Sequence, residues 1–294
     1  MLLGQVGYTK MSDLSFKKFG RRKTFRTLFR LYRTKPCANQ SLTFVFQNQD
    51  IQINTNSYGA FYEKNLPFTT SNLKRIIMQD GREVAFLEDL FEPHVSHIRE
   101  PTIVISDIDD TLLHSFISRK LRKFRTMMFT TMEKRKAVAH MKELMTNLVT
   151  DGAAAVYVSN SEQNLYPLIY RFLKHNAFPD GPVFLKQLRS LWDLIRNVKF
   201  PVKNIHKTAT LKDLIAFFPS HRFVLMGDNT QQDLNIYLSI AEQYPQNVAC
   251  VVIRKVVERK KDYPLVTATE EKLKRLGVRF YYGESFPTQI LVGR

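Results

Sequence analysis

Four apolar segments that alternate with helical stretches dominate the sequence after Pro101. Each segment ends in polar residues, and together they are TIVIS (102–106), AAAVYVS (153–159), RFVLMG (222–227) and NVACVVI (247–253). Strands that alternate with helices along a chain predict a parallel sheet covered by helices on both faces. In such sheets ligands bind beyond the carboxyl ends of the strands, which is where the polar residues of this chain stand.

Three carboxylates follow the first of these segments. In TIVISDIDDTLLH (102–114) the apolar strand runs into Asp107, Asp109 and Asp110, whose like charges repel one another unless something binds them. Asp228 follows another strand. Carboxylates from two strand ends form a hard oxygen site for Mg²⁺, which takes one or two carboxylates together with substrate and water. The sequence therefore predicts Mg²⁺ as the cofactor, and the bound ion would relieve the repulsion.

The polar residues at the strand ends also suit phosphoryl transfer. Asp107 can attack phosphorus and form an aspartyl-phosphate, and Asp109 can protonate the leaving oxygen and later deprotonate the attacking water. Ser159 and Lys207 would hold the phosphoryl oxygens, and Thr111 would tie the loop. Neither GxGxxG nor GxxxxGK[ST] occurs, so a phosphate must be held in another way. Each residue alone is explained by a turn, a helix cap or a surface lysine, but their joint order favours a phosphatase.

This order of motifs resembles that of haloacid-dehalogenase-like phosphatases, and more closely that of the actin-patch-type phosphatidate phosphatases. The likeness spans residues 100–256. It rests on SDIDDT (106–111), VYVSNSEQNLYPLIYRFL (156–173), HKTATLKDLIAFFP (206–219), FVLMGDNTQQDLNIYLSIAEQYP (223–245) and VVIRKV (251–256). The resemblance implies phosphoester hydrolysis, because an aspartate occupies position 109.

The resemblance also implies a role for each matching residue. Asp107 would be the nucleophile and Asp109 the acid and base. The implied metal ligands are Asp107, the backbone carbonyl of Asp109, and Asp228, with Asp233 in support. The implied phosphate-binding residues are Ser159 and Lys207. We also predict that Thr111 and Asn160 bind the substrate.

Two departures from the family pattern leave metal affinity and fine substrate choice open. The family usually reads GDSGE where this chain has Gly-Asp-Asn-Thr-Gln (227–231), which removes one carboxylate near the metal. After Ser-Asn-Ser the family often has Pro-Trp, whereas this chain has Glu162-Gln163. Asp110 is also open, because it either forms hydrogen bonds within the loop or tunes the metal site.

Changes in composition and in the spacing of apolar residues divide the chain into three parts. Residues 1–40 form a basic segment, and residues 41–98 form a small antiparallel β domain in which Asp80-Gly81 predicts a tight hairpin turn. Residues 99–294 form the phosphatase domain. The fold class is then α/β, with a Rossmann-like parallel sheet, helices on both faces and a minimal cap within 112–158, preceded by the small β domain. The histidines of the linker, His94 and His97, are attributed to a surface loop.

The charge balance is strongly basic. Lys and Arg number 44 against 27 Asp and Glu, a net charge of +17, which attracts polyanions such as nucleic acid or an anionic lipid surface. Basic residues with interleaved apolar ones cluster at 17–35 and 119–125. The first cluster predicts an amphipathic helix, either on a membrane or packed against the rest of the protein. The segment between the first two motifs (112–158) is too short for a large lid, which leaves the site open to a bulky substrate. We expect this substrate to be phosphatidate at a membrane surface.

Cysteine content points to a reducing compartment, and hydropathy bears on whether a helix could cross a membrane. Cys37 and Cys250 are too few for a disulfide framework, and no apolar run reaches the ~18 residues that span a membrane. We expect a cytoplasmic protein, with peripheral attachment to a membrane as an option. The predicted function is Mg²⁺-dependent phosphatidate hydrolysis. Two alternatives stay open: the same chemistry on a soluble metabolite or phosphoprotein, and an inactive basic module that binds nucleic acid or lipid. Oligomeric state is not predicted.

Overall fold

The computed structural model describes residues 2–8, 26, 30, 34–63, 66–68, 71–85, 94–95, 98–113, 137–186, 205–230, 232–256, 263–287 and 290. The chain divides into two compact units. The first comprises Met1–Ile98, Glu162–Arg171 and Gln187–Val198, and the second comprises Arg99–Ser161, Phe172–Lys186 and Lys199–Arg294. The expected boundaries after residues 40 and 98 stay predictions.

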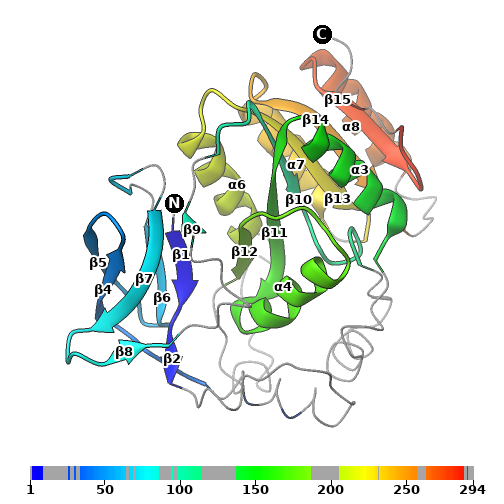
Figure 1. Cartoon of the computed structure of the whole chain (residues 1–294). Coiled ribbons are helices and arrows are strands. Elements are labelled where there is room, and N and C mark those ends of the chain that lie inside the picture. The colour runs from blue at the N-terminus through cyan, green and yellow to red at the C-terminus, as the bar shows by residue number, and fades with distance from the viewer. Residues whose placement is uncertain are drawn as a thin grey trace. The chain divides into compact units, whose positions relative to one another are not determined.

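The second unit is built on a six-stranded sheet (Figure 1). Its strands are β10 (Thr102–Ser106), β11 (Ala153–Glu162), β12 (Val183–Lys186), β13 (Arg222–Asp228), β14 (Val248–Arg254) and β15 (Arg279–Gly283). Helices α3 (Ala139–Thr150), α6 (Ile205–Phe217), α7 (Asp233–Gln243) and α8 (Tyr263–Arg275) connect them, and η3 (Gln163–Leu165) and α4 (Tyr166–His175) follow β11. The four apolar segments all form strands, which confirms the predicted α/β class.

Strand order fixes where a ligand site can lie. The order is β12-β11-β10-β13-β14-β15, and β10 runs parallel to both of its neighbours. From β10 the chain moves outward through β11 and β12, then returns to β13 beside β10 and moves outward the other way. Right-handed crossovers then place α3 on one face and α6, α7 and α8 on the other. The reversal between β10 and β13 opens a crevice at their carboxyl ends.

Continuous apolar runs form these strands because both faces of the sheet are covered. Ile103, Val104 and Ile105 are fully buried at consecutive positions of β10, although successive side chains point to opposite faces. The helix α7 packs against β13 and β14 and contacts both α6 and α8. It buries Leu234, Ile236, Tyr237, Ile240 and Ala241 along one side. This packing fixes the first turn of α7 close to the end of β13.

The first unit contains a small antiparallel sheet. Its strands are β4 (Ser41–Phe46), β5 (Asp50–Asn54), β7 (Ser71–Met78), β8 (Glu83–Val84) and β9 (His94–Val95), and shorter pairs join β1 (Leu2–Gln5) to β6 (Ala60–Glu63) and β2 (Gly7–Tyr8) to β3 (Lys35–Pro36). Alternate residues of β4 are buried, as expected for a strand with one face on a core. The Asp80-Gly81 turn between β7 and β8 is confirmed, and Gly81 adopts the φ of +83° that favours glycine there.

Several predictions fall where the structure describes little or nothing. The basic cluster at 119–125, most of the cluster at 17–35, His97 and the cap residues 114–136 all lie outside the described residues, so the amphipathic helix and the minimal cap stay predictions. None of the described helices combines the length and apolar character that a membrane crossing requires. Cys37 and Cys250 are both buried free thiols.

Candidate active site

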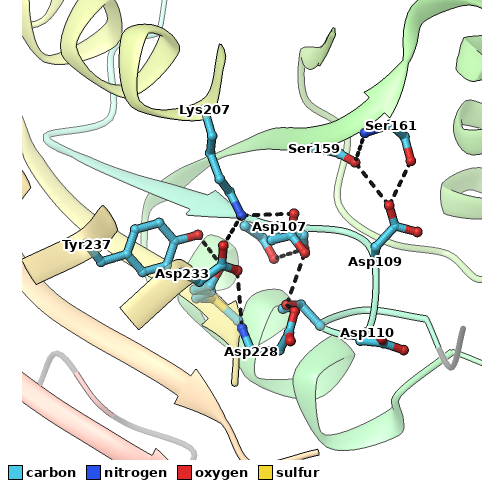
Figure 2. Close-up of polar contacts among 12 residues, drawn as sticks. Asp107, Asp109, Asp110, Ser159, Ser161, Lys207, Asp228, Asp233 and Tyr237 are labelled. Atoms are coloured by element: carbon cyan, nitrogen blue, oxygen red, sulfur yellow. Dashed lines mark hydrogen bonds and ion pairs between the residues drawn. The ribbon is translucent and has the colours of Figure 1, made fainter. Parts of the chain in front are cut away.

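The predicted acidic residues meet at the crevice between β10 and β13. Asp107 follows β10 directly, and its backbone N–H donates to the Met226 carbonyl of β13 at 2.8 Å. Asp228 is the last residue of β13, and Asp233 is the first of α7. Figure 2 shows the side chains of Asp107, Asp228 and Asp233 converging at this point. The local strand ends, together with the strand order, therefore bring three carboxylates into one place.

These three carboxylates form a buried cluster that could hold a metal ion. One oxygen of each lies within 4.8 Å of the others, and all three residues are almost fully buried. Burial raises the pKa of Asp107 well above its usual value; Lys207 opposes this shift, and the neighbouring carboxylates add to it. Burial and Asp233 raise the pKa of Asp228 to about 7. Three carboxylates this close together and out of water are stable in their charged form only if positive charge offsets them, and a bound cation would supply it.

Oxygen ligands at this site fit a hard divalent cation. Asp107 Oδ1 accepts no hydrogen bond from any residue that the structure describes, although it lies 3.0 Å from Lys207 Nζ. Thr111 Oγ1 lies 3.4 Å from Asp107 Oδ2 and 3.3 Å from Asp228 Oδ2, so the predicted substrate-binding threonine stands between the two carboxylates. Carboxylate oxygens with spare lone pairs are the donors that Mg²⁺ prefers.

Lys207 places one ammonium group against the cluster. This lysine belongs to α6 and is fully buried, and its Nζ lies 2.5 Å from Asp233 Oδ1 and 3.0 Å from Asp107 Oδ1. The Tyr237 ring lies below the ammonium at 5.5 Å. Burial alone would lower the pKa of Lys207, but Asp107 and Asp233 outweigh it and hold that pKa well above its usual value. Lys207 is therefore a fixed positive charge beside Asp107.

Asp109 faces a different direction from the cluster. Its Oδ2 accepts a hydrogen bond from Ser161 Oγ at 2.7 Å and a longer one from Ser159 Oγ at 3.4 Å. Figure 2 shows the Asp109 side chain directed toward the two serines of β11. The backbone N–H of Ser161 also donates to Ser159 Oγ at 2.9 Å. Next to them, the buried Oδ1 of Asn160 accepts no hydrogen bond within the described part of the chain.

Ser161 was not among the predicted site residues. The sequence nevertheless carries a signal for it, because residues 159 and 161 of a strand point to the same face. A hydroxyl predicted to act at 159 therefore has a second hydroxyl beside it. Of these two serines, the prediction included only Ser159.

Asp110 makes contacts through both its backbone and its side chain. It is buried and has a φ of +59°, a left-handed conformation that aspartate tolerates better than most residues. Its carbonyl accepts a hydrogen bond from Arg254 Nη1 at 2.5 Å, and its Oδ2 lies 3.4 Å from Thr230 Oγ1. Arg254 is a buried residue at the end of β14, opposite Asp228 in the register. Asp110 therefore hydrogen-bonds to the end of β14 and to the segment after β13, and these contacts lie outside its own loop.

Thr230 lies in the segment where this chain departs from the GDSGE pattern. Both its backbone N–H, at 2.5 Å, and its hydroxyl donate to Asp228 Oδ1. These two hydrogen bonds lower the pKa of Asp228 against the effect of burial. The departure at 229–231 therefore leaves Asp228 firmly oriented.

Gly227 leaves the space that α7 needs beside β13. A methyl group added at its Cα would lie 2.4 Å from Asp233 Oδ2 and 2.7 Å from Asp233 Cβ. We expect Gly227→Ala to lower the free energy of unfolding by about 1–3 kcal/mol and to weaken metal binding, because Asp233 must move. Urea denaturation and Mg²⁺ titration measure the two effects.

Gly283 provides the matched control for Gly227. It ends β15, and an added methyl would meet Ser285 O at 3.3 Å, a much milder contact. We expect Gly283→Ala to change the free energy of unfolding by less than about 1 kcal/mol. Equal losses in the two variants would show that the contact with Asp233 does not matter.

Comparison with known proteins places this site in a family. The family model described as phosphatidate phosphatase APP1, catalytic domain, matches residues 102–255, just over half of the chain and the whole of the site described above. The chain belongs to this family. The resemblance noted in the sequence is thereby confirmed.

Two curated relatives extend the comparison. The protein named phosphatidate phosphatase APP1 of Saccharomyces cerevisiae is 29% identical over 164 residues, which cover 55% of this chain and 27% of the relative. A protein of Schizosaccharomyces pombe, named as uncharacterized, is 26% identical over 244 residues, or 78% of this chain and 38% of the relative. The matched parts are thus less than half the length of either relative.

Proposed function

We propose that this chain is a Mg²⁺-dependent phosphatase that hydrolyses phosphatidate to diacylglycerol and phosphate. The observation that carries the proposal is the buried cluster of Asp107, Asp228 and Asp233, with Lys207 fixed against it at the β10–β13 crevice. Membership of the family of the phosphatidate phosphatase APP1 catalytic domain supports the substrate.

In the proposed first step an oxygen of Asp107 attacks phosphorus. A bond forms between this oxygen and phosphorus, and the bond from phosphorus to the diacylglycerol oxygen breaks. Asp109 gives its proton to the departing oxygen, so that diacylglycerol leaves as a neutral alcohol. Lys207 offsets negative charge on the phosphoryl oxygens, and its ion pair with Asp233 keeps the ammonium in place.

In the second step water attacks the aspartyl-phosphate. Asp109, now ionised, takes a proton from the water, and the bond between phosphorus and Asp107 breaks to release phosphate. Asp107 is then a carboxylate again and Asp109 is protonated, so both residues are ready for another turnover. Mg²⁺, held by Asp107, Asp228 and the Asp109 carbonyl with Asp233 in support, would supply positive charge beside the transferring group.

The net charge supports a lipid substrate. A chain with a net charge of +17 is attracted to anionic lipid at about 1 kcal/mol for each basic residue near the surface. We propose that the protein works as a peripheral protein on the cytoplasmic side of a membrane. The same charge would also suit nucleic acid, but a module that only binds has no need of a buried carboxylate cluster with a paired lysine.

Phosphate release in mixed micelles tests the proposal. We expect EDTA to stop phosphatidate hydrolysis and added Mg²⁺ to restore it. We expect Asp109→Asn to slow this hydrolysis by about 10²- to 10⁴-fold. If the protein hydrolyses a soluble aryl phosphate but not phosphatidate, the proposed mechanism stands and the proposed lipid substrate is wrong. Steeply salt-dependent binding of nucleic acid with no phosphate release would favour the binding module instead.

Metal binding itself is expected to stabilise the protein. Free Mg²⁺ at a hundred times its dissociation constant raises the free energy of unfolding by about 2.7 kcal/mol, if only the folded state binds it. Asp228→Asn removes one carboxylate of the cluster, and we expect this variant to lose most of the effect. Thermal unfolding with increasing Mg²⁺ measures it, and an identical response of Asp228→Asn and wild type would contradict the assigned ligand.

A further inference from the structure

We propose that Arg254 is a positioning residue for Mg²⁺ binding. Its hydrogen bond to the Asp110 carbonyl holds the backbone so that the neighbouring Asp109 carbonyl faces the ion. The inference rests on the proposed function, in which the Asp109 carbonyl is one of the metal ligands. It starts from a contact between two distant parts of the chain: Arg254 Nη1 donates to the Asp110 carbonyl at 2.5 Å.

The sheet holds Arg254 in place. Arg254 is the last residue of β14, which pairs with β13 on one side and with β15 on the other. Its own carbonyl accepts a hydrogen bond from the Asn229 N–H at 3.1 Å. The side chain is also buried, since Arg254 has an exposed fraction of only 8%. A planar guanidinium on an inner strand is therefore a rigid anchor for the loop after β10.

Asp110 has a backbone conformation that benefits from such an anchor. Its φ is +59°, in the left-handed region, which is unfavourable for a residue with a Cβ. The peptide group before Asp110 carries the Asp109 carbonyl, and the peptide group after it carries the Asp110 carbonyl. Because peptide groups are planar, the φ and ψ of Asp110 set the direction of one carbonyl relative to the other. Arg254 holds the second carbonyl, and a positive φ then fixes the direction of the first.

Position and charge predict opposite effects of Arg254 on the metal. Arg254 lies beside the proposed ligand Asp228 in the register of β13 and β14. A positive charge at this place repels Mg²⁺. Removal of the charge alone would therefore tighten Mg²⁺ binding, whereas loss of the hydrogen bond that positions the loop would weaken it. The sign of the change identifies the role.

Isothermal titration calorimetry of the metal-free protein with Mg²⁺ alone measures this sign. We expect Arg254→Met to raise the dissociation constant of Mg²⁺ about 10- to 100-fold, as for the loss of one hydrogen bond that involves a charged group. Arg279→Met is the matched control, because Arg279 Nη1 also donates to a backbone carbonyl, that of Ile290, at 2.8 Å. Arg279 begins β15 and so lies at the opposite edge of the parallel sheet. We expect this control to leave the dissociation constant within about twofold of wild type, because distant charges are screened.

A pair of substitutions at Asp110 tests the backbone directly. Asp110→Gly and Asp110→Ala both remove the side chain and its contact with Thr230, but glycine takes a positive φ without a steric penalty and alanine does not. With Arg254 present, we expect the two dissociation constants for Mg²⁺ to agree within about threefold, because the hydrogen bond holds either residue in place. In an Arg254→Met background, Asp110→Ala should bind Mg²⁺ about 5- to 30-fold more weakly than Asp110→Gly, since the loop can then leave the left-handed conformation.

Urea denaturation in EDTA shows whether each variant is folded. If Arg254→Met does not fold, Arg254→Lys replaces it in both experiments. Lysine keeps the positive charge but lacks the planar guanidinium that reaches the Asp110 carbonyl. Weaker Mg²⁺ binding by Arg254→Lys would therefore come from lost positioning, because the charge is unchanged.

The outcomes separate this inference from the proposed function. Mg²⁺ binding that is unchanged or tighter in the folded Arg254 variant would overturn the positioning role while the phosphatase assignment stands. An equal difference between Asp110→Gly and Asp110→Ala with and without Arg254 would overturn it as well. A wild type that binds Mg²⁺ but releases no phosphate from phosphatidate would overturn the proposed function alone, and a wild type that binds no Mg²⁺ would overturn both.

Discussion

Asp107→Asn is expected to lower phosphatidate turnover at least about 10⁴-fold and to leave the metal-free protein no less stable than wild type. Asparagine has nearly the same shape but no carboxylate to attack phosphorus. The variant also removes one of three buried like charges. Lys207 loses its 3.0 Å contact with Asp107 but keeps the shorter contact of 2.5 Å with Asp233. The ammonium therefore stays paired, and the reduced repulsion offsets the lost contact.

Both halves of this expectation can be measured on the same samples. Phosphate release gives the rate, urea denaturation in EDTA gives stability, and acid-quenched mass spectrometry detects covalent phosphate on the peptide that contains residue 107. Asp151→Asn at the exposed end of α3 is the matched control, and it should leave rate and stability unchanged. Residual activity above about 1% in Asp107→Asn would exclude Asp107 as the nucleophile, because a nucleophile contributes far more than that.

Lys207→Met is expected to lower the free energy of unfolding of the metal-free protein by about 3–5 kcal/mol at neutral pH. Methionine fills a similar volume but leaves Asp107 and Asp233 without the ammonium that contacts both. Removing one partner of a buried ion pair is costly because the other partner stays charged and out of water. Phosphate release should also fall, because the charge beside the phosphoryl group is lost.

Two conditions should reduce this loss of stability. Burial already raises the folded-state pKa values of Asp107 and Asp228, and Lys207 opposes both shifts. Without Lys207 these two pKa values rise further above the unfolded value of about 3.9. The cost is therefore present at neutral pH and disappears as the pH falls below that unfolded value, where both states are protonated. Mg²⁺ should also recover part of the stability, because the ion replaces the missing positive charge. Urea denaturation at several pH values, with EDTA or with Mg²⁺, measures both effects.

Lys272→Met provides the comparison for Lys207→Met. Lys272 pairs with Glu242 at 3.3 Å on the surface, and both side chains are about half exposed. We expect this variant to cost less than about 1 kcal/mol, since water and salt screen the pair. If the two lysine variants lost similar stability, the buried carboxylates would not depend on Lys207 for compensation.

The fold was predictable from sequence where burial leaves a continuous apolar run. The strands β10, β11, β13 and β14 lie inside the sheet and were all expected, because helices cover both of their faces. The two edge strands were missed. β12 has four residues, too few to show a pattern, and β15 is only half-buried along its whole length, with Arg279 and two tyrosines among its residues.

The acidic residues of the site were predictable from sequence, but some of the residues that hold them in place were not. Asp107, Asp228 and Asp233 were expected to act together, and the structure brings their oxygens within 4.8 Å of one another. Ser161 and Arg254 were not expected. A serine that hydrogen-bonds a carboxylate and an arginine that bonds a carbonyl are common residues in common positions, and only their partners make them distinctive.

Sequence by itself determined which kinds of element form and which chemical groups stand at their ends. Apolar runs, turn residues and strand-end acids are local features, because each depends on a few neighbouring residues. Tertiary structure alone decided which strand ends are neighbours and which side chains meet. The hydrogen bond from Arg254 to Asp110 joins residues 144 positions apart, and the one from Thr111 to Asp228 joins residues 117 apart. Such contacts depend on strand order and register, which follow from packing of the whole sheet.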